Sequence, residues 1–233
     1  MSFVVTYSGV TDVSVGCHAK TRPAVPAPLR DVTITRIAGR DSGFYDADRT
    51  FADVVIPVTF SFSDQDPNRW ATIYRAVKAW LLSGDNGDLS FSDDPGYHYR
   101  VHNVVITGTE RLVRKIGEVT AEFYCDGYTY LDSGDTQINL AATIYNDYAL
   151  SKPTYSISGR GACTLTVNNK AMTMTVNGAI TIDTERMIAT SAGNWVNTTV
   201  SGDYEDLWLR PGSNSLSITS GFSCKITPYW RCL

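Results

Sequence analysis

Residues 66–84, DPNRWATIYRAVKAWLLSG, decide the fold class because they form the one stretch with a clear helical period. Asp66 offers an N-cap acceptor ahead of Pro67, and Gly84 supplies a C-cap glycine. Between them, large apolar side chains recur three and four residues apart. We therefore predict an amphipathic helix over residues 66–83, and its packing face contains Trp70, Ile73, Val77, Trp80 and Leu81.

Short runs rich in Val, Ile, Thr, Tyr and Phe flank this helix and predict strands. These runs are residues 32–35, 54–62, 88–91, 97–107 and 118–124. Pro57 favours a sheet edge or a bulge at its position. A single amphipathic helix must bury its apolar stripe, and the surrounding sequence offers mostly strands for that purpose. We expect an α+β domain with one helix laid on a sheet or sandwich.

The second half of the chain is predicted to be all β. Asn168-Asn169 joins the predicted strands 164–167 and 172–176, and Asn177-Gly178 predicts another tight turn before a third strand at 179–182. Further predicted strands are residues 195–200, 207–209, 216–219 and 222–226. We predict a mainly β fold with two domains, residues 1–140 and 141–233, the second a small β-sandwich.

Composition restricts the partners of this 233-residue chain. Its 20 Lys and Arg against 24 Asp and Glu give a net charge of −4, which lacks the basic footprint of a nucleic-acid-binding module. We find no apolar run near the ~20 residues that span a bilayer, and residues 1–15 do not resemble a signal peptide. From the charge and the lack of a long apolar run, we expect neither nucleic-acid nor membrane binding. The five cysteines form no CxxC pair, and we expect them to be reduced thiols.

Candidate chemistry is sparse. His98, Arg100 and His102 alternate along one predicted strand and so share a face, where two histidines and Glu122 could hold a metal. No further Cys or His lies at ligand spacing, and we favour ordinary polar residues on a sheet face. The carboxylate pairs fall in predicted turns, and no nucleophile-elbow, zinc-protease or phosphate-loop motif occurs. We predict no catalytic residue, no metal site, no cofactor and no enzymatic activity.

Residues 36–51 form an unusually long predicted loop between strands. Long ordered loops in compact domains are commonly functional. We interpret this loop as an arm that packs on a neighbouring subunit, with a flexible surface loop as the alternative. The candidate contact residues of the arm are Arg40, Phe44, Tyr45, Arg49 and Phe51.

Aromatic residues provide the remaining signal in the second half. Trp195, Tyr204 and Trp208 are candidates for contact with a partner protein or a glycan, because Trp and Tyr give a large contact area at low entropic cost. The alternative is that these rings belong to the core.

Several of these segments together resemble the siphophage distal tail protein family. In the first half they are Gly39-Arg40-Asp41 with Gly43, Val54–Phe62, Trp70–Leu82, Leu89–Pro95, Tyr97-His98-Tyr99 and Phe123–Asp126 with Tyr128 and Tyr130. In the second half they are Asn177-Gly178, Ile182-Asp183, Ser201-Gly202-Asp203 and Leu209–Gly212, which resemble the galectin-like C-terminal domain of that family. Their order and spacing cover most of the chain.

The resemblance implies a structural virion protein of the tail tip, made in the bacterial host cytoplasm. It implies a homohexameric ring built by the N-terminal domain with a protruding hairpin or arm, which we place on residues 39–51. The implied partners are the tail tube protein, the tail-tip protein associated with the tape measure, and a receptor-binding protein. The alternative function is a lectin-like module that recognises host-surface glycans. A galectin-like shape does not by itself carry sugar binding.

Overall fold

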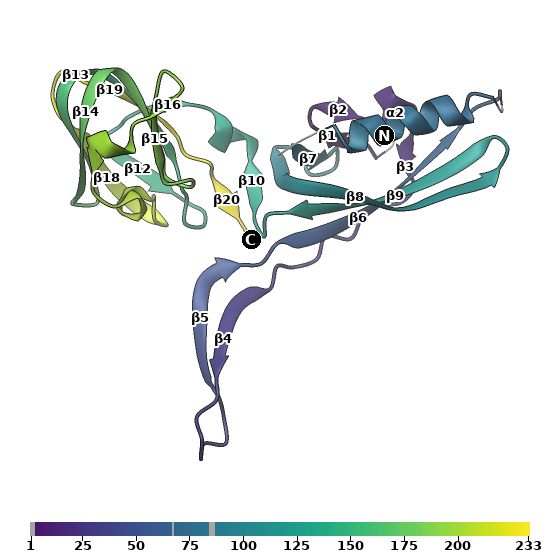
Figure 1. The fold of residues 1–233 in the computed structure, drawn as a ribbon, viewed down its shortest axis with the longest axis horizontal. Helices are drawn as coiled ribbons and strands as arrows, with labels where there is room; N and C mark the ends of the chain where they lie inside the picture. Colours follow the sequence, from purple (N-terminus) through teal and green to yellow (C-terminus); the bar gives the residue numbers. More distant parts are fainter. Residues whose placement is uncertain (1–2, 67, 84–86) are drawn as a thin grey trace. The chain divides into compact units, whose positions relative to one another are not determined.

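The computed structural model describes residues 3–66, 68–83 and 87–233, with the side chains of 46–49 and 112 outside that description. Its contacts divide the chain into two units (Figure 1). Unit 1 is Met1–Thr129 with Leu233, and unit 2 is Tyr130–Cys232. The predicted mainly β fold is confirmed. Among the described residues, no helix combines the length and the apolar character needed to cross a membrane.

Unit 1 is built on an antiparallel sheet in the order β2-β1-β7-β8-β9-β6-β3. Its central strands β6 and β9 pair without interruption from Val54↔Cys125 to Ser63↔Ile116, and their side chains alternate between buried and partly exposed. That alternation marks a sheet with one face on the core. The strands are β1 (Val5–Tyr7), β2 (Val10–Thr11), β3 (His18–Ala19), β6 (Val54–Ser63), β7 (Asp88–Phe91), β8 (Tyr97–Val113) and β9 (Ile116–Cys125).

Helix α2 (Trp70–Leu81) is the predicted helix, but it begins later than the sequence indicated. Asp66 does not cap it: its Oδ1 accepts a hydrogen bond from Asn68 N at 2.9 Å, and the residue before the helix is Arg69, without a side-chain cap. An Asx turn therefore precedes the helix. The predicted contributions of Pro67 and Gly84 lie outside the described residues.

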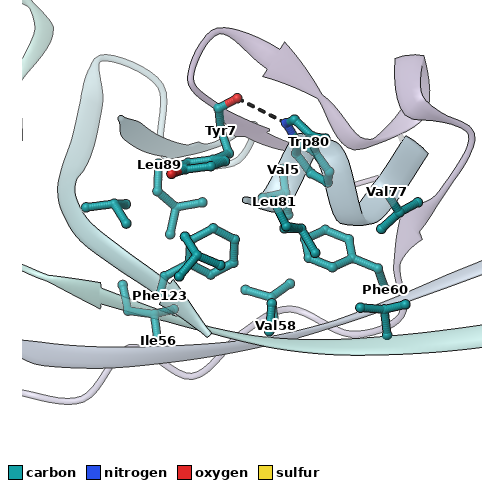
Figure 2. Packing of buried hydrophobic residues seen from close by; sticks show 14 of the residues in the cluster. Val5, Tyr7, Ile56, Val58, Phe60, Val77, Trp80, Leu81, Leu89 and Phe123 are labelled. Atoms are coloured by element: carbon teal, nitrogen blue, oxygen red, sulfur yellow. Dashed lines mark hydrogen bonds between the residues drawn. The ribbon is translucent and has the colours of Figure 1, made fainter. Parts of the chain in front are cut away.

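The core of unit 1 lies between α2 and the sheet (Figure 2). Trp80 is 6% exposed, meets the rings of Tyr7 and Phe60 edge-on, and donates from Nε1 to Tyr7 O at 3.2 Å. This hydrogen bond satisfies the one polar atom of a buried indole ring. Pro57 lies in the part of β6 that has no pairing with β3, because β3 pairs only with Ser61 and Phe60.

The N-terminal elements were missed by the sequence analysis. Strands β1 to β3 and the short helix α1 (Asp12–Val15) lie between Val5 and Ala19. Thr11 Oγ1 accepts a hydrogen bond from Ser14 N, and Gly16 ends the helix with φ of 88°. Four residues are too few to establish a helical period, and strands of two or three residues are too short to show alternation.

The predicted loop 36–51 is wrong in its second half. Residues 44–51 form strand β5 (Phe44–Phe51), which pairs with β4 (Arg30–Thr35) as a separate two-stranded sheet. The charged sequence of β5 hides its strand character, because it lacks the apolar and polar alternation of a strand with one buried face.

Unit 2 is built around one long hairpin, β13 (Thr154–Val167) and β14 (Lys170–Asp183), paired over its whole length. Asn168 and Asn169 have φ of 49° and 65° and form its tight turn, as predicted. Strands β19 (Ser223–Thr227) and β18 (Gly212–Ile218) pair with opposite halves of β13. The remaining elements are β11 (Ile138–Asn139), β12 (Thr143–Asn146), β15 (Ile188–Ser191), β16 (Asn194–Trp195), β17 (Val200–Ser201), η2 (Asn197–Thr199) and η3 (Tyr204–Leu207).

Three predicted features of unit 2 are wrong. Asn177-Gly178 is not a turn but an internal part of β14, opposite Arg160 and Gly159 of β13. Residues 195–200 are not one strand: they divide between β16, η2 and β17. Residues 207–209 are not a strand either: Leu207 ends the 3₁₀ helix η3, and Leu209 forms a single bridge with Ser151. Non-local pairing overrides the local signal in each case.

The two ends of unit 2 lie side by side. Strand β10 (Thr129–Leu131) pairs with β20 (Arg231–Cys232), Leu131 N donates to Trp230 O at 2.9 Å, and Tyr229 N donates to Gly134 O of η1 (Asp132–Asp135) at 2.9 Å. Residues 130–140 therefore make contacts within unit 2. The contact boundary falls at Thr129, whereas the sequence placed a domain boundary at residue 140; separate folding of the two domains stays a prediction.

Candidate functional site

The hairpin β4–β5, called the arm below, exposes apolar side chains that no described neighbour covers. Ile34 and its cross-strand partner Tyr45 are 55% and 63% exposed, and Val32 lies two residues along the same face. Phe44, opposite Thr35, is 53% exposed. A grouped exposed apolar surface on a soluble protein marks an interaction site.

The base of the arm is fixed to unit 1. The ring of Phe51 meets that of Tyr128 edge-on at 5.6 Å, and Ala52 N donates to Leu29 O at 2.8 Å. Gly127 allows the close approach, since a Cβ there would lie 2.7 Å from Ala52 O. Phe51 therefore anchors the arm and does not belong to its exposed surface.

The predicted arm residues thus separate into three groups. Phe44 and Tyr45 are on the exposed part of β5, Phe51 is at the base, and Arg40 is exposed in the connection between the strands. Arg40 N donates to Ile37 O at 3.2 Å in that connection. The side chain of Arg49 lies outside the described residues. Ile34 and Val32, which complete the apolar face, were missed because they precede the segment that the sequence singled out.

The predicted packing face of the helix lies in the core of unit 1. Val77, Trp80 and Leu81 are buried, and Trp70 and Ile73 are partly buried against the same cluster. Trp70 also stacks on Tyr74 at 5.2 Å, and Arg111 lies 4.9 Å from the Trp70 ring. This face holds α2 on the sheet and is not available to a partner.

The three aromatic candidates of unit 2 have different environments. Trp195, on β16, is 80% exposed. Trp208 is partly buried: its Nε1 donates to Thr184 O at 3.3 Å, and Lys152 Nζ lies 5.3 Å from its ring centroid. Tyr204 packs against the core, and burial raises the pKa of its hydroxyl. Of the three, Trp195 alone presents most of its ring to solvent.

The histidine arrangement differs from the one expected. His98 is buried, with Nε2 3.9 Å from Asp88 Oδ1, whereas His102 is exposed and its Nε2 lies 2.7 Å from Asp126 Oδ1. Asp53 joins His102 and Asp126, and the ligand atoms of these three lie within 4.8 Å of one another. Glu122 instead accepts a hydrogen bond from Tyr124 Oη at 3.2 Å, which raises the pKa of that phenol. This grouping of three side chains was not predicted from the sequence.

The cysteines are not poised as nucleophiles. Burial raises the pKa of Cys17, Cys125 and Cys224 to about 12, with a further contribution from a neighbouring ionisable group in each case. Burial also raises the pKa of Cys163. Since the thiolate is the reactive form, these four thiols are unreactive near neutral pH.

Residues 21–125, which include the arm, α2 and strands β6 to β9, match the family model described as the phage tail protein RIFT-related domain. Over these residues the chain is similar to phage tail proteins. No curated protein gives a significant sequence match. The resemblance to siphophage distal tail proteins stated from the sequence is confirmed by this family match and by the fold.

Two solved structures share the fold of this chain over almost its whole length. The Dit protein of phage SPP1, reported as a paradigm of the hub adsorption apparatus in phages that infect Gram-positive hosts, matches with a TM-score of 0.70 and 14% identity, over 97% of this chain and 98% of that one. A chain of the phage P2 baseplate, in its activated conformation with Ca, matches with a TM-score of 0.56 and 9% identity, over 100% and 99%.

Proposed function

We propose that this chain is a structural phage tail protein, a hub subunit of the tail tip, which assembles as a homohexameric ring and acts by assembly without catalysis. The observation that carries the proposal is the apolar surface of the arm. It is exposed in the single chain although the base of the arm is firmly anchored. An anchored strand pair with an uncovered apolar face is suited to pack on a neighbouring subunit.

A ring also requires a particular kind of interface. Head-to-tail contacts join two different surfaces of the same subunit and close when the rotation between subunits is right. The arm supplies one such surface, and another part of the neighbouring unit 1 supplies its partner. The hub character of the SPP1 protein with the same fold supports this arrangement.

The wider partners follow from the same proposal. The ring connects the tail tube protein on one side to the tail-tip protein associated with the tape measure on the other. Unit 2 carries the receptor-binding protein, and Trp195 is its proposed contact because a large, exposed aromatic ring suits the centre of a protein interface. No nucleic-acid or membrane contact is part of the proposal.

Native mass spectrometry of the full chain over a range of concentrations tests the ring. We expect a six-subunit species for the unmodified chain. The variant Ile34→Ser with Tyr45→Ser removes the apolar surface of the arm, and we expect it to raise the concentration for half-assembly at least about tenfold. Met187→Ser, at a residue of unit 2 that is 43% exposed, is the matched control and leaves assembly unchanged. Equal assembly of all three proteins would exclude the arm as the subunit contact.

A lectin-like function is the second candidate, because Trp195 is 80% exposed on an edge strand. A tryptophan in this position can stack on the face of a sugar ring. A glycan array with the unmodified chain and Trp195→Ala tests it directly. Binding that disappears in the variant supports the lectin function, and no binding by the unmodified chain excludes it.

A further inference from the structure

We propose that Asp53, His102 and Asp126 form a binding site for a first-row divalent transition-metal ion, with Zn²⁺ as the ion to test. The three side chains belong to unit 1, and their ligand atoms lie within 4.8 Å of one another. From the sequence, His102 was considered as a ligand only together with His98 and Glu122, and no metal site was predicted because no further Cys or His lies at ligand spacing. This inference does not depend on the proposed ring.

The backbone places the three residues at one position of the sheet. Val54 of β6, Cys125 of β9 and Val101 of β8 form a row across three adjacent strands, and all three are buried against the core. Asp53, Asp126 and His102 are their chain neighbours. Since successive side chains of a strand point to opposite faces, these neighbours gather on the face away from the core.

A β-bulge in β8 sets the position of His102. Val101 and Asn103 pair with the consecutive residues Cys125 and Tyr124, so His102 is the extra residue of β8. Bulges of this kind redirect a side chain. His102 Nε2 here lies 2.7 Å from Asp126 Oδ1, in direct hydrogen-bond contact. Around a tetrahedral Zn²⁺, two such ligands lie roughly 3.3 Å apart, so small rotations of these partly exposed side chains admit the ion.

The donor set determines the class of ion. One imidazole nitrogen and two carboxylates suit Zn²⁺ and its neighbours in the first transition row, whereas Ca²⁺ takes sites built from oxygen alone. Three protein ligands leave a fourth position for water.

The site has a structural consequence at the base of the arm. Asp53 follows β5 directly after Ala52, whose N–H donates to Leu29 O before β4. His102 lies in β8 of the main sheet, and Asp126 is the residue directly after β9. A bound ion would therefore tie the exit of the arm to the sheet, and would restrict the direction in which the arm leaves unit 1.

Isothermal titration of the chelator-treated full chain with ZnCl₂ tests the site, with Co²⁺ absorption in the visible range as a second readout. We expect one bound ion per chain. His102→Gln and Asp53→Asn should each weaken Zn²⁺ binding by more than about tenfold, since they remove a direct ligand. The matched control is His18→Gln, which removes the exposed histidine of β3 and should bind as the unmodified chain does.

Amide hydrogen exchange, measured with and without Zn²⁺, locates the bound ion in the folded chain and so separates loss of the site from loss of folding. In the unmodified chain, Zn²⁺ should slow exchange at Ala52 and Val54 and at residues 126–128, and it should do so in neither ligand variant. Absence of saturable Zn²⁺ binding by the unmodified chain would overturn the proposal. Equal Zn²⁺ affinity of the unmodified chain and His102→Gln would also overturn it, because the binding would then be adventitious surface binding. A stronger affinity of the unmodified chain for Ca²⁺ than for Zn²⁺ would overturn it as well.

Discussion

Single residues set the response of this protein to alkaline conditions. Cys17, Cys125 and Cys224 are buried thiols whose pKa is raised to about 12 from an ordinary value of 9.0. Burial is the main cause in each case, because it disfavours the charged thiolate. Cys232 is the most accessible of the five cysteines. Reactivity towards thiol reagents should therefore differ sharply between the folded and the unfolded chain.

The raised pKa values predict a loss of stability above pH 9. Between pH 9 and pH 12 the unfolded chain releases the three thiol protons and the folded chain retains them, so the free energy of unfolding falls as the pH rises. Urea unfolding at pH 8 and pH 10 measures the difference. Cys125→Ala should reduce the pH dependence, whereas Cys232→Ser should leave it unchanged. A pH dependence that is identical in both variants would contradict the assignment.

Individual side-chain environments were the hardest feature to predict from the sequence. Trp195 and Trp208 are both tryptophans in short β-rich segments, yet one is 80% exposed and the other donates to Thr184 O. The difference arises from non-local pairing, which makes β16 an edge strand. His102 shows the same limit, because a bulge in β8 cannot be recognised from alternation alone.

Elements with a strong local period were predicted well. Helix α2 was recognised from its apolar spacing, and strand β7 was predicted with its observed bounds, residues 88–91. The internal Asn177-Gly178 was misread because it carries a turn signal inside a paired strand. Its partner strand has glycines at Gly159 and Gly161, and the pairing of the two strands stays in register through this stretch. Strand β5 was missed because it is exposed and charged.

The packing of α2 on the sheet depends on the absence of a side chain at Gly117. This glycine of β9 pairs with Phe62, and an added Cβ would overlap the rings of Phe62 and Trp70. Gly117→Ala should therefore destabilise unit 1 by about 1–3 kcal/mol through overpacking. Denaturant unfolding monitored by tryptophan fluorescence measures the change.

Gly108→Ala is the matched control for this prediction. Gly108 lies on the neighbouring strand β8, and an added Cβ there would meet Thr120 at 3.7 Å, an ordinary contact distance. We expect a change within about 0.5 kcal/mol. Equal effects of the two substitutions would mean that the loss reflects the strand conformation of glycine and not the contact with the start of α2.

At the scale of the whole chain, the two hydrophobic clusters draw on separate sets of residues. The buried cluster of unit 1 extends from Val5 to Cys125, and that of unit 2 extends from Ile144 to Ile226. Each therefore has a core of its own, which is the main requirement for independent folding. The position of the boundary, at residue 129 or at residue 140, decides whether a fragment of unit 2 keeps residues 130–140.

Fragment 130–232 is predicted to fold alone and to be more stable than fragment 141–232. The shorter fragment loses the pairing of β10 with β20, the pairing of Ile138 with Ile226, and the hydrogen bond from Tyr229 N to Gly134 O. A loss of only about 1 kcal/mol would lower the melting temperature by roughly 4–8 °C in a domain of this size. Thermal unfolding followed by circular dichroism measures both fragments. Equal melting temperatures would instead favour a boundary at residue 140, because residues 130–140 would then contribute nothing to the stability of unit 2.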